Sequence, residues 1–441
     1  MADNTLTSAA SLLWEMQGTL QELYPKDYVF LAELSGVQKG NVPSDTFDSM
    51  GANGRITQDL QPASFYRDYS GLRVRVPLQP IGLQGAGSPT ETGTINVPIP
   101  LGFSEAHITL ARVVAPASIT MDLADDTMDN AAVNMITTLA TKQRQALAET
   151  VNDQLLGDGV GTLATAISTQ AGAGGLTLSV AAGTDFDKLY IGRVVDVLTA
   201  ASGADPGQGL RRKISAISES ATAGTVTFDT AQQASDGGSG NITLSNAVGV
   251  YIPGSWGNVI QGLEQAAAIT GTFEGIAKGT YAYWQGTDAR QGVTTVAPLS
   301  EPMLDTATLL GQRAGVGQWD FAIGDPQAIN VYKNGKASQL RYNAPTTTLS
   351  SGFKGITYDG LDQELPLIPE RRFKTGAIKL IKRDRMHLYG RHAGPKFEDS
   401  TGSPWQRFSR SLPRESWYVD RLQLGVHDCA SIVFLNNLAV S

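Results

Sequence analysis

Four aspartates crowd into a span of eight residues, at Asp122, Asp125, Asp126 and Asp129. Carboxylate clusters of this kind can bind a divalent cation, because hard cations prefer oxygen ligands. The same residues also suit the start of a helix, where Asp is a good N-cap and negative side chains meet the positive end of the helix dipole. We expect the four aspartates to begin a helix and not to bind a metal.

The histidines and the cysteine offer little chemistry. The four histidines are scattered through the chain, and His387 and His392 stand five residues apart in a strand-like region, which predicts that they point to opposite faces. Further zinc ligands are not evident near them. Cys429 is the only cysteine, which excludes disulfides within the chain and cysteine metal sites, and we expect it to be a small core residue.

Two glycine-rich stretches resemble known motifs only weakly. In "IGLQGAGSP" the glycine spacing is wrong for a dinucleotide fingerprint, and a hairpin tip is the better interpretation. "DGGSGNITL" resembles a calcium-binding β-roll repeat but occurs once, which favours a polar turn. Because no nucleophile elbow, P-loop or zinc-protease helix is present either, the sequence predicts no enzyme and no cofactor.

The composition limits the classes of partner. Charged residues make up 17% of the 441 residues, below the usual quarter, which suggests that partners cover much of the surface. The net charge of −8 argues against a chain that binds nucleic acid along its whole length, although a protein that only encloses DNA need not be basic. No stretch of 18 apolar residues predicts a membrane span, and the first residues do not resemble a secretory signal, so we expect a cytoplasmic protein.

The element that these aspartates introduce is one long helix, predicted over residues 122–156. Neither Pro nor Gly interrupts the segment after Ala124, and Gly157 and Gly159 supply a stop. Apolar residues recur at helical spacing on one face: Met128, Ala132, Met135, Ile136, Leu139, Ala146, Leu147, Val151 and Leu155. Such a helix would be roughly 50 Å long. We expect it to lie across a sheet with its other side exposed. A coiled coil is the alternative, but the heptads are not sustained.

Two segments before this helix look as if they need a neighbour. Residues 1–52 open with an amphipathic helix, whose apolar face includes Leu12, Leu13, Met16 and Leu20, followed by a polar, glycine-rich strap. An ordinary first helix with a loop is the alternative interpretation. Residues 53–115 contain the alternating runs "LRVRVPL" and "TINVPIPL" on either side of a flexible tip, which predicts a long β-hairpin. The hairpin segment carries Arg67, Arg73 and Arg75, and the last two share a face.

The chain after the long helix has two segments with different sequence patterns. Residues 159–256 contain five short strand patterns, LTLSV, RVVDVLT, LRRKISAI, TVTFD and VGVYI, which predict a small antiparallel barrel or sandwich. Residues 257–441 are mixed α/β, with a helical "DTATLLGQRAG", a strand–turn–helix pattern in "WDFAIGDPQAINVYKNG" and strand runs in "KTGAIKLIKRDRMHLYGRHAG" and "FSRSLPRESWYVDRLQLGVHDCASIVFLNNL".

This order of elements resembles the major capsid proteins of tailed bacteriophages, whose fold is shared with encapsulin shell proteins. The resemblance implies an α+β fold with an N-terminal arm, an extended β-hairpin loop, a long spine helix, peripheral and axial domains, and an inserted small β-barrel-like domain. The implied divisions are arm 1–52, extension loop 53–115, peripheral domain with spine helix 116–158, inserted β domain 159–256, peripheral return segment 257–284, axial domain 285–375, peripheral strands 376–424 and axial C-terminal strand 425–441.

The resemblance also implies a function. A capsid protein of this kind self-assembles as hexamers and pentamers into an icosahedral shell that encloses double-stranded DNA without sequence-specific binding. It is assembled in the cytoplasm of the host bacterium and becomes part of the virion. Scaffold, portal and cement proteins are further partners that the family uses. The contacts between subunits would include the arm leucines and Met16, the three hairpin arginines and the four aspartates named above.

Two other classes remain open on the sequence alone. One is an encapsulin-like shell that stores cargo protein, which the inserted domain and the long extension loop disfavour. The other is a β-rich secreted surface or carbohydrate-binding protein. Such a protein would share the texture rich in Gly and Thr but would not need the long helix.

Overall fold

The computed structural model of this chain covers several separate stretches. It describes residues 30–31, 34, 66–68, 73–81, 102–120, 135–168, 177–181, 188–200, 202–205, 209–219, 223–229, 248–313, 318–337, 346–348, 354–359, 364–390, 395–398, 405–406 and 414–440.

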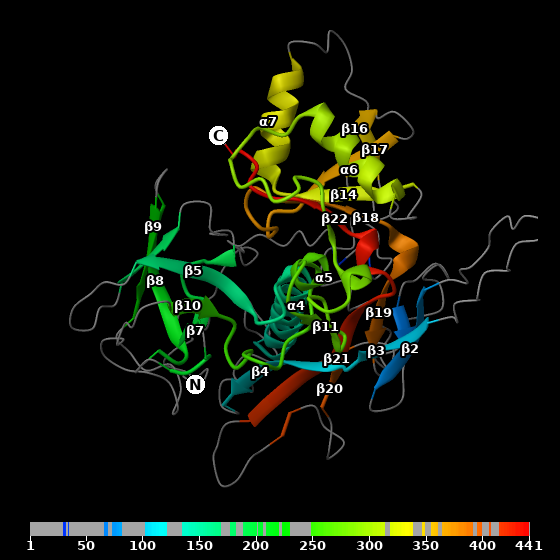
Figure 1. The fold of residues 1–441 in the computed structure, drawn as a ribbon. Helices are drawn as coiled ribbons and strands as arrows, with labels where there is room; N and C mark the ends of the chain where they lie inside the picture. Colours follow the sequence, from blue (N-terminus) through cyan, green and yellow to red (C-terminus); the bar gives the residue numbers. More distant parts are fainter. Residues whose placement is uncertain are drawn as a thin grey trace, which may run out of the picture.

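One layer is a five-stranded sheet crossed by the long helix α4 (Met135–Leu156). Its strands are β1 (Tyr66–Asp68), β4 (Ala111–Ile119), β19 (Met386–Gly390), β20 (Lys396–Phe397) and β21 (Arg414–Val426). β21 is the central strand, since β4, β19 and β20 all pair with it in antiparallel register. Gln143 of α4 donates to the carbonyl oxygens of Ala115 and Ser416 at 3.1 and 2.9 Å, which ties the helix to the sheet beneath it (Figure 1).

The described part of α4 has 22 residues and is therefore about 33 Å long. It ends before Gly157, as predicted, while residues 121–134 of the expected helix lie outside the described residues. The expectation that one side of the helix is exposed is wrong for its C-terminal end, because every side chain of residues 151–156 is buried. Buried polar residues on this end meet partners from other segments, and those partners are distant in the sequence.

A β-hairpin stands beside this layer, as predicted. β2 (Val74–Ile81) and β3 (Gly102–Ile108) pair in antiparallel register, with Val74 opposite Ile108, and the tip between them lies outside the described residues. Val76 and Leu78 pack partly against the core of the five-stranded layer. Arg73 and Arg75 are exposed on the opposite face, which confirms the predicted alternation. The base of the hairpin therefore rests on its own subunit.

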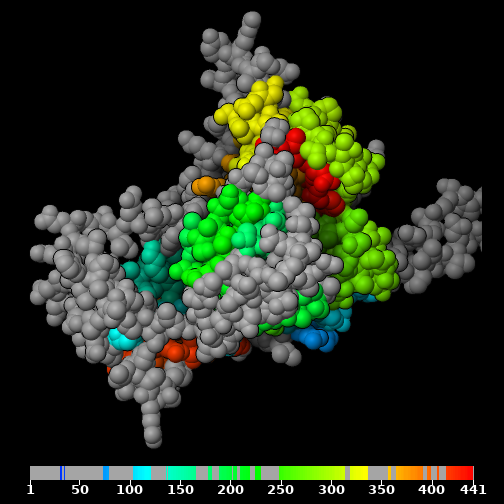
Figure 2. All heavy atoms as spheres, turned by 90° about the vertical axis from the view of Figure 1, so that its left-hand side faces the viewer, coloured from blue at the N-terminus to red at the C-terminus, as the bar shows by residue number. Residues whose placement is uncertain are grey.

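Six strands after α4 close into a barrel in the order β10-β5-β6-β9-β8-β7. They are β5 (Thr162–Ser168), β6 (Thr177–Ala181), β7 (Val194–Thr199), β8 (Arg212–Glu219), β9 (Ala223–Phe228) and β10 (Val248–Tyr251). The barrel has its own apolar core, separate from the other two cores. Figure 2 looks onto this side of the molecule, where green barrel residues face the viewer below the yellow-green helices of the third layer.

The sequence predicted five of these strands and missed β5. Its residues, "TLATAIS", are mostly small, and the strand begins directly after the glycines at Gly159 and Gly161. Ala and Gly have low strand propensity, so the pattern was weak although β5 pairs with both β10 and β6.

The third layer is a seven-stranded sheet with the order β13-β22-β18-β14-β17-β16-β15. Its strands are β13 (Thr287–Asp288), β14 (Phe321–Gly324), β15 (Thr346–Thr348), β16 (Lys354–Asp359), β17 (Glu364–Pro369), β18 (Ile378–Ile381) and β22 (Val433–Leu435). Helices α6 (Glu301–Arg313) and α7 (Pro326–Ala337) accompany it, as the sequence patterns predicted (Figure 1).

One predicted assignment differs here. Residues 376–424 were expected to group as peripheral strands, but β18 pairs with β14 and β22, whereas β19 joins the five-stranded sheet. All four residues of β18 are buried, as expected for an internal strand of a sheet covered on both faces. The chain passes between the two sheets through the short 3-10 helix η4 (Arg383–Arg385).

Short elements connect the layers between residues 263 and 284 and near residue 430. They are α5 (Leu263–Ala267), β11 (Thr272–Phe273), β12 (Ile276–Ala277), η3 (Ala282–Trp284) and η5 (Cys429–Ser431).

Candidate functional site: a buried charged junction and the base of the hairpin

Four charged side chains meet in the interior where α4, the barrel and the seven-stranded layer come together. Arg372, just after β17, contacts both oxygens of Asp153 at 2.9 Å and Oε1 of Glu149 at 3.2 Å. Arg193 of the barrel contacts Asp153 at 2.8 Å and Glu149 at 3.3 Å. We call these four residues the charged junction. It is electrically balanced, with two carboxylates and two guanidinium groups, so no net charge is buried.

The electrostatics of the charged junction favour the ionised forms of Asp153 and Arg193. Burial by itself raises the pKa of Asp153, but Arg372 and Arg193 outweigh burial and hold the pKa below its usual value. Burial likewise acts to lower the pKa of Arg193, and the two carboxylates outweigh it. Tyr190 donates to Glu149 at 3.2 Å, and burial together with this carboxylate raises the tyrosine pKa. Asp153 and Arg193 are therefore both charged at neutral pH.

The helical residues Phe30 and Leu31 are tied to the same place. The backbone N–H of Phe30 donates to Glu370 at 3.1 Å, and that of Leu31 donates to the side chain of Asn152 on α4 at 3.3 Å. Glu370 also accepts a hydrogen bond from the backbone N–H of Arg372 at 3.4 Å. Three separate segments of the chain, near residues 30, 190 and 370, therefore converge on the C-terminal half of α4.

A second set of charges holds α5. Glu264 in its first turn pairs with Lys374 at 2.8 Å and with the buried Lys379. Burial alone would raise the pKa of Glu264, but Lys379 and Lys374 lower it to about 2. At the other end of α5, the Lys278 ammonium donates to three carbonyl oxygens of residues 265, 266 and 268 at 2.9, 2.6 and 2.7 Å. These contacts place positive charge at the negative end of the helix.

The tight turn between β11 and β12 connects the hairpin to the sheet. Glu274 has φ +49° and Gly275 has φ +82°, so a non-glycine residue occupies a left-handed conformation. The Glu274 carbonyl accepts from the His107 N–H of β3 at 2.7 Å, and its carboxyl accepts from the Val426 N–H of β21 at 2.8 Å. Burial raises the pKa of Glu274 to about 8, which keeps the carboxyl mostly protonated at neutral pH.

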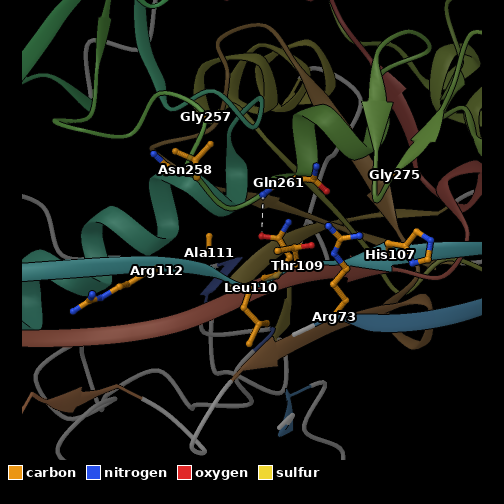
Figure 3. Close-up of a pocket in the computed structure, with 12 residues that line it drawn as sticks. Arg73, His107, Thr109, Leu110, Ala111, Arg112, Gly257, Asn258, Gln261 and Gly275 are labelled. Carbon is orange, nitrogen blue, oxygen red and sulfur yellow. Dashed lines mark hydrogen bonds between the residues drawn. The ribbon is translucent and has the colours of Figure 1, made fainter. Parts of the chain in front are cut away.

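Beside this turn, a cavity of about 710 Å³ opens at the base of the hairpin (Figure 3). It is lined by Arg73, His107, Thr109, Leu110, Ala111, Arg112, Gly257, Asn258, Val259, Gln261, Gly275 and Gln423. In Figure 3, Asn258 and Gln261 lie on one side, and Arg73, Thr109 and Leu110 lie on the other. Among the lining residues that the structure describes there are two arginines and several amides but no aspartate or glutamate.

The structure describes only part of the residues that the sequence assigned to contacts between subunits. Leu12, Leu13, Met16, Leu20, Asp122, Asp125, Asp126 and Asp129 lie outside the described residues. Arg67 was predicted on the hairpin, but it lies in β1, which pairs in parallel with β19 of the five-stranded sheet. Arg75 is 73% exposed and lies 3.9 Å from Glu105 across the hairpin, while Arg73 lines the cavity. The two arginines therefore share a face but have different surroundings.

The histidines are less scattered than predicted. β19 and β21 run antiparallel and bring His387 and His427 together, with ring centroids 4.6 Å apart. His427 also shares a hydrogen bond of 3.0 Å with the hydroxyl of Tyr389. His392 lies outside the described residues. Cys429 is fully buried in the core, as predicted.

The described residues include no group of three His, Cys, Asp or Glu side chains that could hold a metal ion. Within the same part of the chain, no helix is long and apolar enough to cross a membrane.

Sequence reasoning missed the charged junction. Glu149 and Asp153 stand four residues apart and so share a face of α4, at an end where the apolar residues are also buried. That pattern was a usable signal for buried acids. Their partners could not be found from it, because Arg193 and Arg372 are 40 and 219 residues from Asp153.

Comparisons with solved structures identify the fold of this chain, whereas comparisons of its sequence find no match. No protein-family model and no curated protein matches the sequence. Among solved structures, the capsid of cyanophage A-1(L) matches with a TM-score of 0.52 and 12% identity, over 98% of this chain and 99% of that one. The SrpI encapsulin of Synechococcus elongatus matches with a TM-score of 0.46 and 10% identity, over 100% and 98%. Mycobacterium phage Bobi matches with a TM-score of 0.43 and 9% identity, over 100% of both chains.

The cyanophage match carries the argument, because the other two scores are lower. The chain therefore shares its α+β fold with the capsid protein of cyanophage A-1(L), and the match extends over nearly all of both chains.

Proposed function

We propose that this chain is the major capsid protein of a tailed bacteriophage, which self-assembles into an icosahedral shell around double-stranded DNA. The observation that carries the proposal is the match to the cyanophage capsid over 98% of this chain. The hairpin beside the five-stranded sheet and the helix α4 across that sheet are the elements that the resemblance assigns to the extension loop and the spine helix.

Under this proposal, hexamers and pentamers of the chain form the shell wall, assembled in the cytoplasm of the host bacterium. The net charge of −8 would let packaged DNA lie inside without sticking to the wall. Scaffold, portal and cement proteins are partners that we propose by analogy with the family. The division into arm, extension loop, peripheral, axial and inserted domains is part of the same proposal.

The arm provides a direct test of assembly. Deleting residues 1–40 removes the apolar face of Leu12, Leu13, Met16 and Leu20 and also Phe30, Leu31 and Leu34, whose side chains are buried in the core. We expect soluble protein that fails to form regular shells, as seen by size-exclusion chromatography and electron microscopy. Replacing only Leu12, Leu13, Met16 and Leu20 by Ser should have the same effect while leaving the buried residues in place. Normal shells from both variants would contradict the role of the arm.

An encapsulin-like shell is the alternative within the same fold. The contents of the particles distinguish the two functions. Particles purified from cells in which the phage propagates should contain DNA protected from nuclease, whereas an encapsulin-like shell should contain a cargo protein. A β-rich secreted binding protein would form no particles at all.

A further inference from the structure

We propose that the cavity at the base of the β2–β3 hairpin binds a small phosphate-bearing anion of the class of pyrophosphate and tripolyphosphate. The inference goes beyond the proposed function, because it concerns a ligand of the single chain and needs no assembly. It rests on the residues that line the cavity, on the hydrogen bonds that orient two of them, and on the volume that they enclose.

Arg73 supplies the positive charge of the cavity and stands directly before β2. Its guanidinium group has five N–H donors and remains protonated at physiological pH. Arg112 also borders the cavity, but its side chain contacts Glu398 at 2.6 Å. In Figure 3 the Arg112 side chain is directed away from Arg73 and His107. Arg73 is therefore the cation that an anion in the cavity would meet.

Two glutamine amides that line the cavity have a defined orientation. Oε1 of Gln423 accepts from the backbone N–H of Gln261 at 3.1 Å, the contact drawn as a dashed line in Figure 3. Oε1 of Gln261 in turn accepts from the backbone N–H of Glu274 at 3.0 Å. Because a backbone N–H can only donate, each amide turns its oxygen towards that group, and its NH₂ group is left as a donor.

These two NH₂ groups lack an acceptor within the part of the chain that the structure describes. Gln423 is only 2% exposed, so its amide nitrogen has little access to solvent outside the cavity. A buried donor without an acceptor is unfavourable, and an oxygen of a ligand in the cavity would remove that cost. The cavity is therefore a site with donors already oriented for an oxygen-rich ligand.

The arrangement of the donors favours a phosphate group over a carboxylate. Arg73 precedes β2, Thr109 lies between β3 and β4, and the two glutamines come from the segment before α5 and from β21. A carboxylate has two oxygens in one plane, whereas the oxygens of a phosphate group are tetrahedral and can accept from donors on several sides. Donors from four segments therefore match a phosphate group.

The size and the lining of the cavity favour a small polyphosphate over a nucleotide or a nucleic acid. A volume of about 710 Å³ has room for more than one phosphate group. Among the described lining residues, His107 carries the only aromatic ring, so there is little surface on which a nucleobase could stack. The net charge of −8 also disfavours the binding of a long nucleic acid.

Calorimetric titration of the purified full-length chain with sodium tripolyphosphate, at low and constant ionic strength, tests the inference. We expect saturable binding of the anion. Arg73→Gln should weaken the binding by about tenfold or more, because it removes charge-assisted hydrogen bonds. Arg75→Gln is the matched control, since Arg75 is an exposed cation two residues away that does not line the cavity. It should change the affinity by less than about threefold.

Two further variants test the oriented donors and the local charge. Gln261→Glu keeps an oxygen for the backbone N–H of Glu274 but replaces the NH₂ donor by a carboxylate oxygen, and it should abolish the binding. Glu105 lies 3.5 Å from Nε2 of His107 without lining the cavity, so Glu105→Gln should strengthen the binding by about two- to threefold. The melting temperature of each variant without the anion shows that it is folded.

Competition experiments identify the chemistry of the ligand. Sodium acetate at the same ionic strength should not displace tripolyphosphate, and a single-stranded DNA oligonucleotide should bind less tightly than tripolyphosphate. Displacement by acetate would assign the cavity to a carboxylate. Tighter binding of the oligonucleotide, with the same dependence on Arg73, would assign the cavity to the DNA backbone. Either result would overturn the inference.

The absence of saturable binding would also overturn the inference, as would binding that either Arg73→Gln or Gln261→Glu leaves unchanged. None of these measurements depends on whether the chain forms particles. The inference and the proposed function can therefore fail separately.

Discussion

Replacing the buried Arg372 by Met should lower the free energy of unfolding by more than replacing an exposed charged residue would. The variant keeps the aliphatic length of the side chain but removes the contacts with Asp153 at 2.9 Å and with Glu149 at 3.2 Å. Arg372 and Asp153 side chains are each only 1% exposed, so water cannot replace the lost partner. Two carboxylates would then share one guanidinium group, that of Arg193.

Removing one partner of a buried ion pair typically costs about 3–5 kcal/mol, because the remaining charge is left uncompensated. With an unfolding entropy of about 2.1 cal/mol/K per residue, 441 residues give about 0.9 kcal/mol/K if the chain unfolds as one unit. The melting temperature should therefore fall by about 3–5 °C. Lys374→Met is the matched control, since Lys374 is 53% exposed and its pair with Glu264 should contribute about 1 kcal/mol or less.

The pH dependence of the stability difference between Arg372→Met and the unmodified protein identifies the cause of the destabilisation. In the unmodified protein, the pKa of Asp153 is held below 3.8, so its stabilisation is present above that pH and is lost only as pH falls further. In the variant, burial should dominate and raise the pKa of Asp153 above its unfolded value. The variant then gains stability as pH falls from 7 towards 4, and the difference from the unmodified protein narrows.

Thermal or urea unfolding at pH 7 and pH 5 measures both effects. A loss below about 1 kcal/mol at pH 7 would show that the charged junction contributes no more than a surface pair. A large loss that stays constant with pH would show that packing, and not an uncompensated charge, explains it.

Four other expectations can be measured on the same protein. Because burial raises the pKa of Glu274 to about 8, the contribution of this carboxyl to the free energy of unfolding falls as pH rises from about 4.5 to 8. Glu274→Gln should therefore flatten that decline in unfolding experiments. An unchanged slope of unfolding free energy against pH would contradict the buried, protonated carboxyl. The ionised Glu264 carboxylate, with a pKa of about 2, stabilises the fold above about pH 4.5, so Glu264→Gln should lower the free energy of unfolding at pH 7 but little at pH 2. Equal losses at both pH values would exclude the ion pairs as the cause. A chain of residues 159–256 should melt cooperatively with β-type circular dichroism, since the barrel has its own core; a disordered spectrum would refute its independence. An isopeptide bond needs a lysine amine, and no lysine lies between Lys39 and Lys142, so boiled particles should give a single band near 46.7 kDa; a ladder that survives reducing agent would contradict this.

Local patterns predicted the elements well where a single periodicity dominated. The alternation around Arg73 and Arg75 gave the hairpin, and Gly157 gave the end of α4. The strand–turn–helix pattern after Trp319 gave β14 and α7. In each case the neighbouring residues determine the conformation, so a short window of sequence contains the information.

Other features depended on contacts between distant segments. The assignment of β18 to a sheet required knowing that Ile378 lies opposite Gly324 and Leu435. The burial of the polar end of α4 required Arg193 and Arg372, and the approach of His387 to His427 required the pairing of β19 with β21. Such contacts between distant segments produce no periodic pattern in the sequence. The cavity is a further case, because its lining comes from the hairpin, β4, the 257–261 segment, the turn between β11 and β12, and β21.

Electron microscopy of the purified full-length chain, with sedimentation velocity on the same sample, tests the central claim most directly. If the chain is a capsid protein, the sample should contain closed particles of uniform diameter. A reconstruction of these particles should place α4 and the five-stranded sheet in the shell wall, with the β2–β3 hairpin over an adjacent subunit. A single sedimenting species at the monomer mass of 46.7 kDa, with no particles on the grid, would contradict the account.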